Sequence, residues 1–479
     1  MCGILGIYGY EDISDDLVFG LTALQHRGQD SAGILTFDNN FHLRKGLGLV
    51  SSVFTQKKQL TGYCGIGQVR YATQGTIDLL NAQPFVVNYP LGLGMVHNGN
   101  VINFAEIKKL LYEEHHRLLE TSNDIELILY TFASELESKN LMNLSLNDIF
   151  SSVEATQRKI KGAYSTISII ANKGFLVFND PYGIRPLVMG QKKTSKGIVY
   201  AFASESTCLD YLEYELLQDL KPGEAIFIDK DRNVHKKICY SKGAAFCVFE
   251  YIYFAKEDSI IHNRLVATER VKMGKLLAKN IKMSGLKPDI VIDIPSSAYF
   301  FASGLAEELG ISYRRGLAKN NHIGRSFISP TKKTREVMVQ QKLNPIRDII
   351  KGKKIAVVDD SIVRGITSKY IVNLLRQRGA KEIYFISASP PIKYPCVYGI
   401  DMSVKQELIA RNYDLDDIAD YIGADALIYQ SIDDIKSLYH DLPCCYACFS
   451  GDYPIEKTKE FLGQIEQERL CSKHTNRNM

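Results

Sequence analysis

The sequence predicts two folded domains: an α+β domain of layered antiparallel sheets, followed by an α/β domain with a parallel sheet. Before about residue 235, short β-like runs separated by Gly and Asn turns alternate in blocks with helical patterns, as in stacked antiparallel layers. After about residue 245, near-continuous apolar strands are each adjoined by an amphipathic helix. This alternation of strands and helices indicates parallel strands joined by crossover helices.

Hydrophobic patterning places the elements of each half. Apolar runs bounded by Gly and Asn predict strands at 4–8, 33–37, 92–96, 163–170, 175–178 and 225–228. A 3.6-residue apolar repeat predicts helices at 104–116, 124–137 and 146–160. In the second half, strands are expected at 287–295, 354–360 and 382–387, with a helix at 368–378. The predicted domains are 1–238 and 239–455, followed by a charged, helical C-terminal extension at 456–479.

The composition is that of an average globular protein. The chain has 479 residues, 45% hydrophobic and 23% charged, with a net charge of +4. A charge this small argues against a nucleic-acid partner. No apolar run approaches the ~18 residues of a membrane span, and the N-terminus lacks the pattern of a secretory signal. We therefore expect a cytoplasmic, membrane-independent protein, in which the ten cysteines are thiols or metal ligands.

Cys2 is a candidate nucleophile. Once Met1 is removed, this residue carries both a thiol and a free α-amine. Because the reference pKa of an α-amine is about 7.7–8.0, its neutral form accepts the thiol proton without a separate histidine. Taken alone, the same residue is more simply a buried cysteine that follows the start codon.

Downstream motifs change that interpretation. They are His26-Arg-Gly-Gln-Asp-Ser-Ala-Gly33, Gly67-Gln-Val-Arg-Tyr-Ala-Thr73, His97-Asn-Gly-Asn100 and Ser122-Asn-Asp-Ile-Glu126. In this order they resemble the class II glutamine amidotransferases, whose N-terminal-nucleophile domain hydrolyses glutamine. The resemblance covers roughly the first half of the chain, and it implies an αββα sandwich there.

The same resemblance implies a role for each matching residue. It makes Cys2 the nucleophile with its α-amine as base, Asn98 and Gly99 the oxyanion hole, and Arg70, Thr73 and Asp124 the glutamine-binding residues. These roles suit the chemistry. An oxyanion needs preorganised donors, and a guanidinium grips a carboxylate with two parallel hydrogen bonds. His26 and His97 are interpreted as structural, because the amine already supplies the base.

A second group of motifs lies in the other half. Lys354-Ile-Ala-Val-Val-Asp-Asp-Ser-Ile-Val-Arg-Gly-Ile-Thr-Ser368 is a strand, two acids and a loop that opens a helix, which directs backbone N–H groups toward a phosphate. The paired carboxylates suit ribose hydroxyls or a hydrated Mg²⁺. The segment is similar to the phosphoribosylpyrophosphate (PRPP) signature of type I phosphoribosyltransferases. That likeness implies PRPP contacts at Asp359, Asp360, Ser361, Arg364, Gly365, Thr367 and Ser368.

Further motifs extend the resemblance to nearly the whole chain. Lys319-Asn-Asn-His-Ile-Gly-Arg-Ser-Phe-Ile328 resembles the loop that closes over PRPP in the amidophosphoribosyltransferase family, which adds Lys319 and Arg325 as PRPP contacts. The segments 180–187, 203–206, 342–345 and 398–401 match that family too. Ser297 occupies the position of the family's third metal-site residue. The implied Mg²⁺ ligands, for one ion per subunit, are Ser297, Asp359 and Asp360.

The resemblance implies a function. Ammonia released from glutamine is transferred to PRPP, giving phosphoribosylamine, glutamate and pyrophosphate at the entry to purine synthesis. Purine nucleotides are candidate feedback inhibitors, and the family assembles as homodimers or homotetramers.

The chain departs from the family's pattern at two places. Ile366 stands where the family has threonine, which predicts weaker PRPP binding, and Gln340 and Gln341 replace basic residues, which bears on nucleotide feedback more than on catalysis.

Four cysteines form a candidate metal site. Cys445-Tyr-Ala-Cys448 has the spacing of metal and iron–sulfur sites. Cys247 and Cys396 match the other two ligand positions of the subclass that carries a [4Fe–4S] cluster. Zinc is the alternative, because four cysteines also suit it. Cys444 is a neighbour that could substitute, and no role is assigned to Cys64, Cys208, Cys239 or Cys471.

Two rival functions stay open on the sequence. One is another class II glutamine amidotransferase, whose acceptor domain should lack the Asp-Asp phosphate loop. The other is a PRPP- or nucleotide-sensing regulator with a disabled transferase site. This alternative stays open because Ile366, Gln340 and Gln341 depart from the family's residues.

Overall fold

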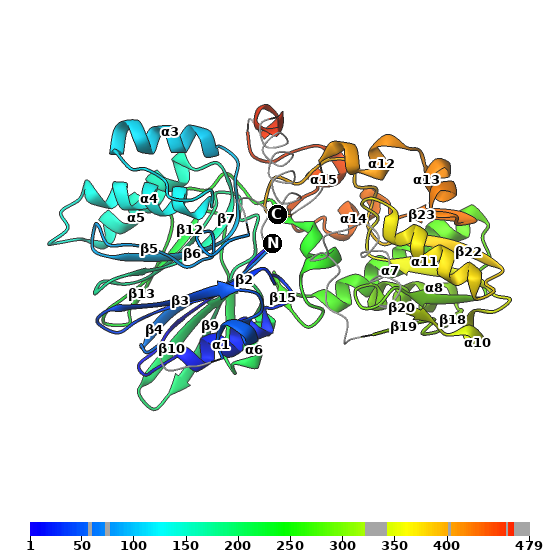
Figure 1. The fold of residues 1–479 in the computed structure, drawn as a ribbon, viewed down its shortest axis with the longest axis horizontal. Helices are drawn as coiled ribbons and strands as arrows, with labels where there is room; N and C mark the ends of the chain where they lie inside the picture. The colour runs from blue at the N-terminus through cyan, green and yellow to red at the C-terminus, as the bar shows by residue number, and fades with distance from the viewer. Residues whose placement is uncertain (56–59, 72–76, 321–342, 401–403, 457, 464–479) are drawn as a thin grey trace.

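The fold has two halves that lie side by side, and the sequence passes from one to the other near its middle (Figure 1). The structure is a computed structural model that describes residues 1–55, 60–71, 77–320, 343–400, 404–456 and 458–463. The predicted residues Thr73, Arg325, Gln340, Gln341 and Cys471 lie outside these ranges. The N-terminus lies close to the junction of the two halves (Figure 1).

The first half is a four-layer sandwich of two antiparallel sheets with helices outside. The seven-stranded sheet has the order β11-β9-β10-β1-β4-β2-β3, and the six-stranded sheet has the order β13-β12-β8-β7-β6-β5. The strands are β1 (Gly3–Tyr8), β2 (Ser31–Phe37), β3 (Phe41–Leu47), β4 (Cys64–Arg70), β5 (Phe85–Val87), β6 (Leu93–Val101), β7 (Gly162–Ile170), β8 (Gly174–Asn179), β9 (Val188–Thr194), β10 (Gly197–Ala203), β11 (Glu215–Asp219), β12 (Glu224–Asp229) and β13 (Val234–Ile238). The helices are α1 (Ser14–Ala23), α2 (Val50–Val53), α3 (Phe104–His115), α4 (Ile125–Glu137), α5 (Leu146–Lys159) and α6 (Ser206–Tyr211).

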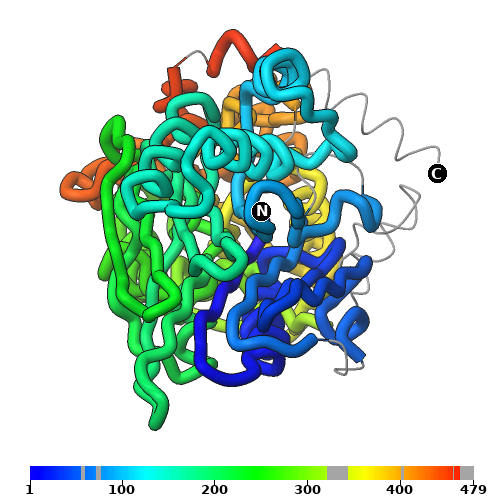
Figure 2. The backbone as a smooth tube through the Cα atoms, turned by 90° about the vertical axis from the view of Figure 1, so that its left-hand side faces the viewer, coloured from blue at the N-terminus to red at the C-terminus, as the bar shows by residue number. Residues whose placement is uncertain are grey.

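Three apolar layers hold this sandwich together. Side chains such as Ile66, Ile167 and Phe175 fill the space between the two sheets. Helices α3, α4 and α5 cover the six-stranded sheet, and α1 and α6 cover the other (Figures 1 and 2). Because both faces of the central strands are covered, β1, β2, β4 and β7 are buried at every position rather than at alternate ones.

The second half contains a five-stranded parallel sheet in the order β18-β17-β21-β22-β23. Its strands are β17 (Ile290–Asp293), β18 (Ser312–Tyr313), β21 (Lys354–Asp359), β22 (Glu382–Ser387) and β23 (Ala426–Tyr429). The helices are α7 (Val266–Ser284), α8 (Tyr299–Leu309), α10 (Arg347–Ile350), α11 (Ile366–Gln377), α12 (Ile409–Asn412), α13 (Leu415–Ile422), α14 (Ile432–Leu438) and α15 (Ala447–Ser450), with a π-helix η1 (Glu250–Phe254) and a 3₁₀-helix η3 (Lys405–Glu407). Short two-stranded pairs are β14 (Phe246–Cys247) with β24 (Cys444–Cys445), β15 (Ile260–Ile261) with β16 (Arg264–Leu265), and β19 (Leu317–Lys319) with β20 (Leu343–Pro345).

Parallel pairing brings the carboxyl ends of β17, β21 and β22 to one edge of this sheet. Ligands of open α/β sheets bind outside that edge. Asp359 is the last residue of β21 and Asp360 directly follows it, so the topology places both acids there. The predicted antiparallel and parallel halves are both confirmed.

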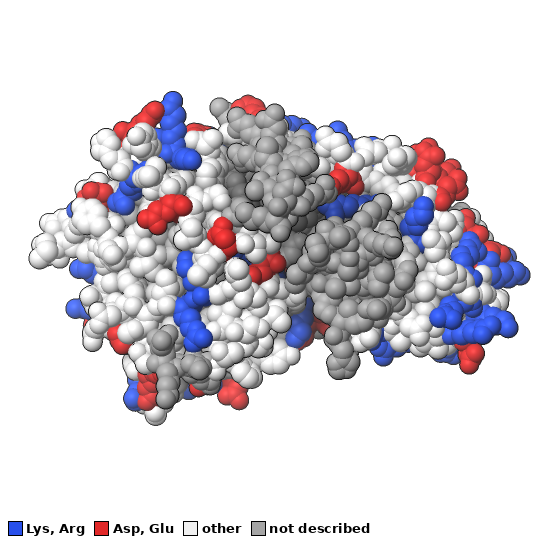
Figure 3. Space-filling model, in the orientation of Figure 1, with Lys and Arg blue, Asp and Glu red and all other residues white. Residues whose placement is uncertain are grey.

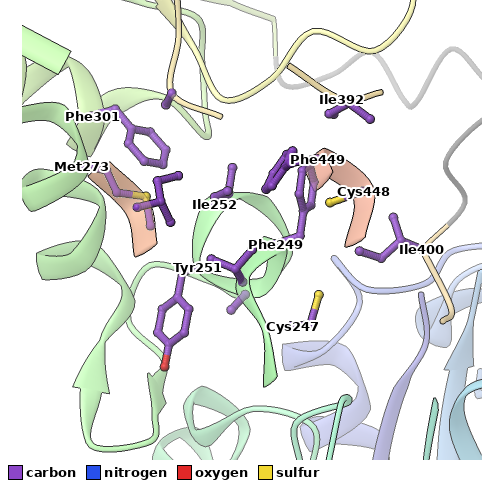
Figure 4. Close-up of a cluster of buried hydrophobic side chains, with 14 of the residues drawn as sticks. Cys247, Phe249, Tyr251, Ile252, Met273, Phe301, Ile392, Ile400, Cys448 and Phe449 are labelled. Atoms are coloured by element: carbon purple, nitrogen blue, oxygen red, sulfur yellow. The ribbon is translucent and has the colours of Figure 1, made fainter. Parts of the chain in front are cut away.

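One apolar cluster crosses between the halves. It joins Met1, Ile102 and Ala163 of the sandwich to side chains around η1 and α15. Figure 4 shows part of it, with Cys247 and Cys448 lying on the same side of the aromatic pair Phe249 and Phe449. The residues on either side of the junction are therefore packed against one another.

The surface carries both signs of charge. On the face in Figure 3, acidic and basic side chains are interspersed, although several basic ones gather at the right-hand end. Within the part of the chain that the structure describes, no helix is both long and apolar enough to cross a membrane.

Candidate active sites

Cys2 is held in the first half by contacts to three segments. It directly precedes β1, and it is only 8% exposed. Its backbone nitrogen lies 3.2 Å from Asn98 Oδ1, and its Sγ lies 3.7 Å from the carbonyl oxygen of Tyr71. Arg27 Nε donates to the Cys2 carbonyl oxygen at 3.0 Å. The predicted nucleophile and the predicted oxyanion residue are thus neighbours, although 96 residues separate them in sequence.

The side-chain amide of Asn98 has a defined orientation. Its Oδ1 accepts from the Cys2 N–H, so its Nδ2 points elsewhere. Nδ2 is buried and has no hydrogen-bond partner among the described residues. A buried donor without an acceptor is costly unless a ligand supplies one. An oxyanion formed beside Cys2 is such an acceptor.

Gly99 needs to be glycine because its backbone lies against β7. A Cβ built on it would lie 1.9 Å from the carbonyl oxygen of Ala163. The position pairs with Tyr164 in the antiparallel register of β6 and β7. The sequence Asn98-Gly99 is therefore part of a strand rather than a hairpin turn.

Two buried, oppositely charged side chains lie near this site. Arg70 ends β4, and Asp124 directly precedes α4. Burial would raise the pKa of Asp124, but the facing His97, the Val101 N–H and the charge of Arg70 together lower it below its ordinary value. Asp124 is consequently a buried carboxylate, which suits pairing with an ammonium group.

His97 supports Asp124 rather than Cys2. Its Nε2 lies 3.2 Å from Asp124 Oδ1, and its Nδ1 lies 2.8 Å from Gln83 Nε2. Because the Gln83 amide donates to Nδ1, the proton of a neutral His97 is on Nε2, facing the carboxylate. His26, the other histidine interpreted as structural, contacts Glu205 at 2.8 Å.

The paired acids of the second half form a compact oxygen cluster. Ser297 Oγ donates to Asp360 Oδ2, and Ser361 Oγ donates to Asp360 Oδ1 at 2.6 Å. The Asp360 N–H donates to Asp359 Oδ1 at 2.9 Å. Burial raises the pKa of both carboxyls, and the charge of Asp360 adds to the effect on Asp359.

This cluster fits a hard divalent cation. Carboxylate and hydroxyl oxygens are the donors such ions take, and a cation beside the pair would offset the repulsion and burial that raise both pKa values. Among the described residues, no group of three or more His, Cys, Asp or Glu side chains is arranged to hold a single metal ion. Ser297, a hydroxyl, is the third member of this donor set.

The predicted phosphate loop opens α11. Gly365 precedes the helix at φ +72°, a left-handed conformation that glycine adopts without strain. Ile366 and Thr367 have exposed side chains in the first turn, and Ser368 is buried. Arg364 instead pairs with Glu407 at 2.5 Å on the surface. The backbone N–H groups at the start of α11 are donors of the kind that bind anions at helix N-termini.

Lys319 lies at the end of β19, where its Nζ donates to Ser296 Oγ at 2.8 Å. Ser296 directly precedes Ser297, so the ammonium group is near the acid cluster. Arg325 and Thr73 lie outside the described residues.

Comparison with known proteins identifies the family. Residues 76–211 match the glutamine amidotransferase domain model, and residues 267–391 match the phosphoribosyl transferase domain model. The amidophosphoribosyltransferase of Escherichia coli is 44% identical over 443 residues, covering 91% of this chain and 88% of that protein. Those of Pseudomonas aeruginosa and Saccharomyces cerevisiae are 42% and 38% identical over 98% of this chain, covering 96% and 95% of their own lengths.

The chain belongs to the amidophosphoribosyltransferase family. A solved glutamine PRPP amidotransferase from B. subtilis, complexed with ADP and GMP, superposes with a TM-score of 0.84 at 36% identity. The match covers 95% of this chain and 98% of that one. The family consists of pentosyltransferases with a glutamine amidotransferase domain, so the predicted enzyme class and the predicted fold class are confirmed. The rival class of other glutamine amidotransferases does not account for the second domain.

The four cysteines of the candidate iron–sulfur site gather at one place in this family member. Cys247 and Cys445 face each other in the β14–β24 register. Cys448 lies in α15, and the Tyr398 N–H is 3.4 Å from Cys396 Sγ. Burial raises the pKa of Cys448, and the nearby thiols of Cys396, Cys445 and Cys247 raise it further. The four thiols are thus close enough to influence one another's charge.

Arg185 makes this environment suitable for anionic sulfur. It is almost fully buried beside Cys247 and Cys396, and its Nε has no hydrogen-bond partner among the described residues. A buried cationic donor favours thiolate over thiol. Four cysteines beside a buried guanidinium are a donor set that suits an iron–sulfur cluster or zinc, although among the described residues they are not arranged to hold a single metal ion.

Cys444 belongs to a different environment. Successive side chains of a strand point to opposite faces, so Cys444 and Cys445 diverge. A hydrogen bond links Cys444 with Tyr446, and burial raises the pKa of the Cys444 thiol to about 12. Cys444 is still near enough to Cys247 for that thiol to raise its pKa, so it lies beside the four-cysteine group but on the other face of β24.

Sequence reasoning missed a buried charge network behind Cys2. Arg27, which holds the Cys2 carbonyl, also forms ion pairs with Glu205 and Glu250. Glu205 in turn accepts from the Lys256 N–H and Ser259 Oγ at 2.9 and 2.8 Å. Arg27 and Glu205 lie within motifs that carried the family resemblance. The signal available in the sequence was Glu250, a charged residue inside the apolar run 246–254.

Proposed function

We propose that this protein transfers ammonia from glutamine to PRPP, giving 5-phosphoribosylamine, glutamate and pyrophosphate. The reaction opens purine biosynthesis in the family that the chain belongs to. The observation that carries the glutaminase half is the orientation of Asn98. Its Oδ1 faces the Cys2 nitrogen at 3.2 Å, and its buried Nδ2 is left as a free donor. The acid cluster at Asp359 and Asp360 carries the transferase half.

In the glutaminase half, the Cys2 thiol attacks the glutamine carboxamide carbon while the α-amine freed by loss of Met1 accepts the thiol proton. Asn98 Nδ2–H and the Gly99 N–H hold the oxyanion. The C–N bond then breaks, the proton passes to the leaving nitrogen, and ammonia departs. Water hydrolyses the remaining thioester and releases glutamate. Arg70, Asp124 and Thr73 bind the α-carboxylate and α-ammonium end of the substrate.

In the transferase half, ammonia attacks C1 of PRPP as pyrophosphate leaves with the bonding electrons. Asp359 and Asp360 bind the ribose hydroxyls, and Ser361, Gly365, Thr367 and Ser368 surround the 5′-phosphate, with Lys319, Arg325 and Arg364 adding positive charge. Bound at Ser297, Asp359 and Asp360, Mg²⁺ would neutralise charge on the pyrophosphate leaving group.

We further propose domain boundaries at 1–238 and 239–455, with 456–479 as a C-terminal extension. The thiols of Cys247, Cys396, Cys445 and Cys448 are proposed to hold a [4Fe–4S] cluster, which would tie the C-terminal segment to the transferase domain. A cytoplasmic homodimer or homotetramer inhibited by purine nucleotides is proposed on the family resemblance. The relative solved with ADP and GMP supports nucleotide binding.

One experiment tests the reaction directly. Protein purified without oxygen is supplied with glutamine, PRPP and Mg²⁺, and glutamate and pyrophosphate are measured together. Equal amounts of both, with glutamate release dependent on PRPP, are expected. Glutamate without pyrophosphate would favour a regulator with a disabled transferase site.

A second experiment tests the cluster. Iron and acid-labile sulfide are measured in the wild type and in Cys396→Ser, with Cys444→Ser as the control. We expect about four of each per chain in the wild type and in the control, and a large loss in Cys396→Ser. Zinc in place of iron would refute the cluster.

A further inference from the structure

The segment 396–400 of the second half contacts the oxyanion strand β6 directly. Asn100 Nδ2 donates to the Val397 carbonyl oxygen at 2.9 Å, across 297 residues of sequence. Gly399 lies beside the backbone of Gly99, where a Cβ on Gly399 would be 3.1–3.2 Å from the C, Cα and O atoms of Gly99. The strand that supplies the oxyanion donors is therefore touched by the segment that begins at Cys396.

This segment is itself firmly fixed. Tyr398 is 1% exposed, and its hydroxyl bonds Thr458 Oγ1 at 2.8 Å and accepts from the Ile455 N–H at 3.3 Å. Tyr453 donates to the Pro395 carbonyl oxygen at 2.7 Å. Figure 4 shows Ile400 directed toward Cys448 in the shared core. The segment thus acts as a rigid support rather than a loose loop.

Gly99 is confined on two sides. The carbonyl of Ala163 in β7 lies on one side, and the backbone of Gly399 lies on another. The Gly99 N–H belongs to the Asn98–Gly99 peptide, which ends at Gly99 Cα, and the Gly399 contact is with that Cα and with the C and O atoms that follow it. A shift of a few tenths of an ångström at Gly399 would rotate or displace that donor.

We propose that Gly399 and Asn100 are positioning residues for the glutaminase oxyanion hole, so that the second half holds the first half in its catalytic geometry. This inference rests on the proposed function, because it assumes that Asn98 and Gly99 stabilise the oxyanion. Neither positioning residue touches the substrate. Both act through the backbone of Gly99.

The test compares Gly399→Ala with Gly243→Ala. Both glycines have nearly the same φ, +98° and +100°, but a Cβ on Gly243 meets nothing within 4 Å. The two variants therefore share the backbone cost and differ in the contact with Gly99. We expect Gly399→Ala to lower kcat for glutamine hydrolysis at least about tenfold, since losing one oxyanion donor costs about 10²–10³. Gly243→Ala should retain wild-type kcat.

Two further readouts separate positioning from general damage. Alkylation of Cys2 by iodoacetamide needs the nucleophile but no oxyanion hole, so Gly399→Ala should keep the wild-type rate. Ammonia-dependent phosphoribosylamine synthesis should also persist, and KM for glutamine should change little. Asn100→Ala, which removes the bond to Val397 without adding bulk, should show the same pattern in weaker form.

Asn98→Ala separates a failure of the positioning role from a failure of the proposed glutaminase function. If Asn98→Ala loses glutamine hydrolysis while Gly399→Ala and Asn100→Ala keep wild-type kcat, the positioning role is refuted and the glutaminase stands. If Asn98→Ala keeps hydrolysis, the oxyanion assignment itself is wrong. Equal loss of hydrolysis, alkylation and ammonia-dependent synthesis in Gly399→Ala would also refute positioning.

Discussion

Arg27 holds the backbone of the nucleophile Cys2, although it is not itself predicted to contact the substrate. Burial would lower the pKa of its guanidinium, but Glu250 and Glu205 raise it well above its ordinary value. The residue therefore stays charged inside the protein while it holds the Cys2 carbonyl at 3.0 Å. It joins the nucleophile to η1, where Glu250 lies, and to Lys256 through Glu205.

Replacing Arg27 with methionine should destabilise the protein strongly. Arg27→Met keeps the length of the side chain but removes the cation shared by two buried carboxylates, so that among the described residues Glu205 keeps only His26 as a charged partner and Glu250 keeps only Arg185, at 3.4 Å. Breaking a buried pair in this way costs about 3–5 kcal/mol.

Urea titration followed by circular dichroism measures the loss. The control is Lys109→Ala, which breaks an exposed i,i+4 pair with Glu113 and should cost only about 0.3–0.5 kcal/mol. Similar losses in both variants would contradict the role of the network.

The acid pair at Asp359 and Asp360 predicts a pH-dependent response to Mg²⁺. Burial and mutual repulsion raise both pKa values in the folded protein. A raised carboxyl pKa contributes stability below the unfolded value of 3.8, and that contribution is lost as the pH rises. Because a cation favours the charged pair, Mg²⁺ should stabilise the protein more at about pH 8 than at about pH 5.

Thermal unfolding with and without about 10 mM MgCl₂ checks this prediction. A gain of about 1 kcal/mol from binding corresponds to a rise in Tm of about 2–4 °C at the higher pH. The double variant Asp359→Asn, Asp360→Asn serves as control and should show no rise. An equal rise at both pH values, or a rise retained in the double variant, would count against a magnesium site here.

At the scale of elements, hydrophobic pattern was sufficient to place most helices and strands. The prediction at 382–387 matches β22 at both ends, and 354–360 and 104–116 exceed β21 and α3 by one residue each. Buried parallel strands and long amphipathic helices carry a strong periodic signal. The predicted strand at 92–96 was too short, because polar residues of the oxyanion motif continue β6 to Val101. The polar side chains of this motif hide the apolar pattern by which a strand is predicted.

The turn before α11 offers a test of how an element positions the phosphate loop. Gly365 and Gly285 have nearly equal φ values of +72° and +73°, but only Gly365 is crowded, because a Cβ added there would lie 2.8 Å from Ile409 Cδ1. Gly285→Ala should cost about 1–2 kcal/mol for the left-handed backbone alone. Gly365→Ala should cost more and should also raise KM for PRPP. The free energy of unfolding and initial rates at varied PRPP measure both effects, and an unchanged KM for PRPP would show that the turn does not align the loop.

At the scale of the whole molecule, sequence motifs predicted both sites but not how they are joined. Each motif is local, so it identifies residues such as Cys2 or Asp359 without fixing what lies between them. The junction depends on contacts across hundreds of residues, including Asn100 with Val397 and Arg27 with Glu250. Those pairings follow from packing of the common core rather than from any spacing in the chain. Of the predicted extension, Thr458 and Leu462 are buried, so this part of it is packed against the protein.

The two-site organisation predicts that ammonia can bypass the first half. Cys2→Ala removes the nucleophile without adding volume, and the hydrogen bonds of Cys2 among the described residues do not reach the acid cluster of the second half. Glutamine-dependent synthesis should therefore fall by at least about 10³-fold, whereas synthesis from ammonium salts and PRPP should retain at least about half of the wild-type rate. Retained synthesis is the informative result, because the transferase chemistry needs only ammonia and PRPP. Loss of both activities in a variant that still unfolds at the wild-type temperature would mean that the halves form one site, with Cys2 needed for transfer as well as for hydrolysis.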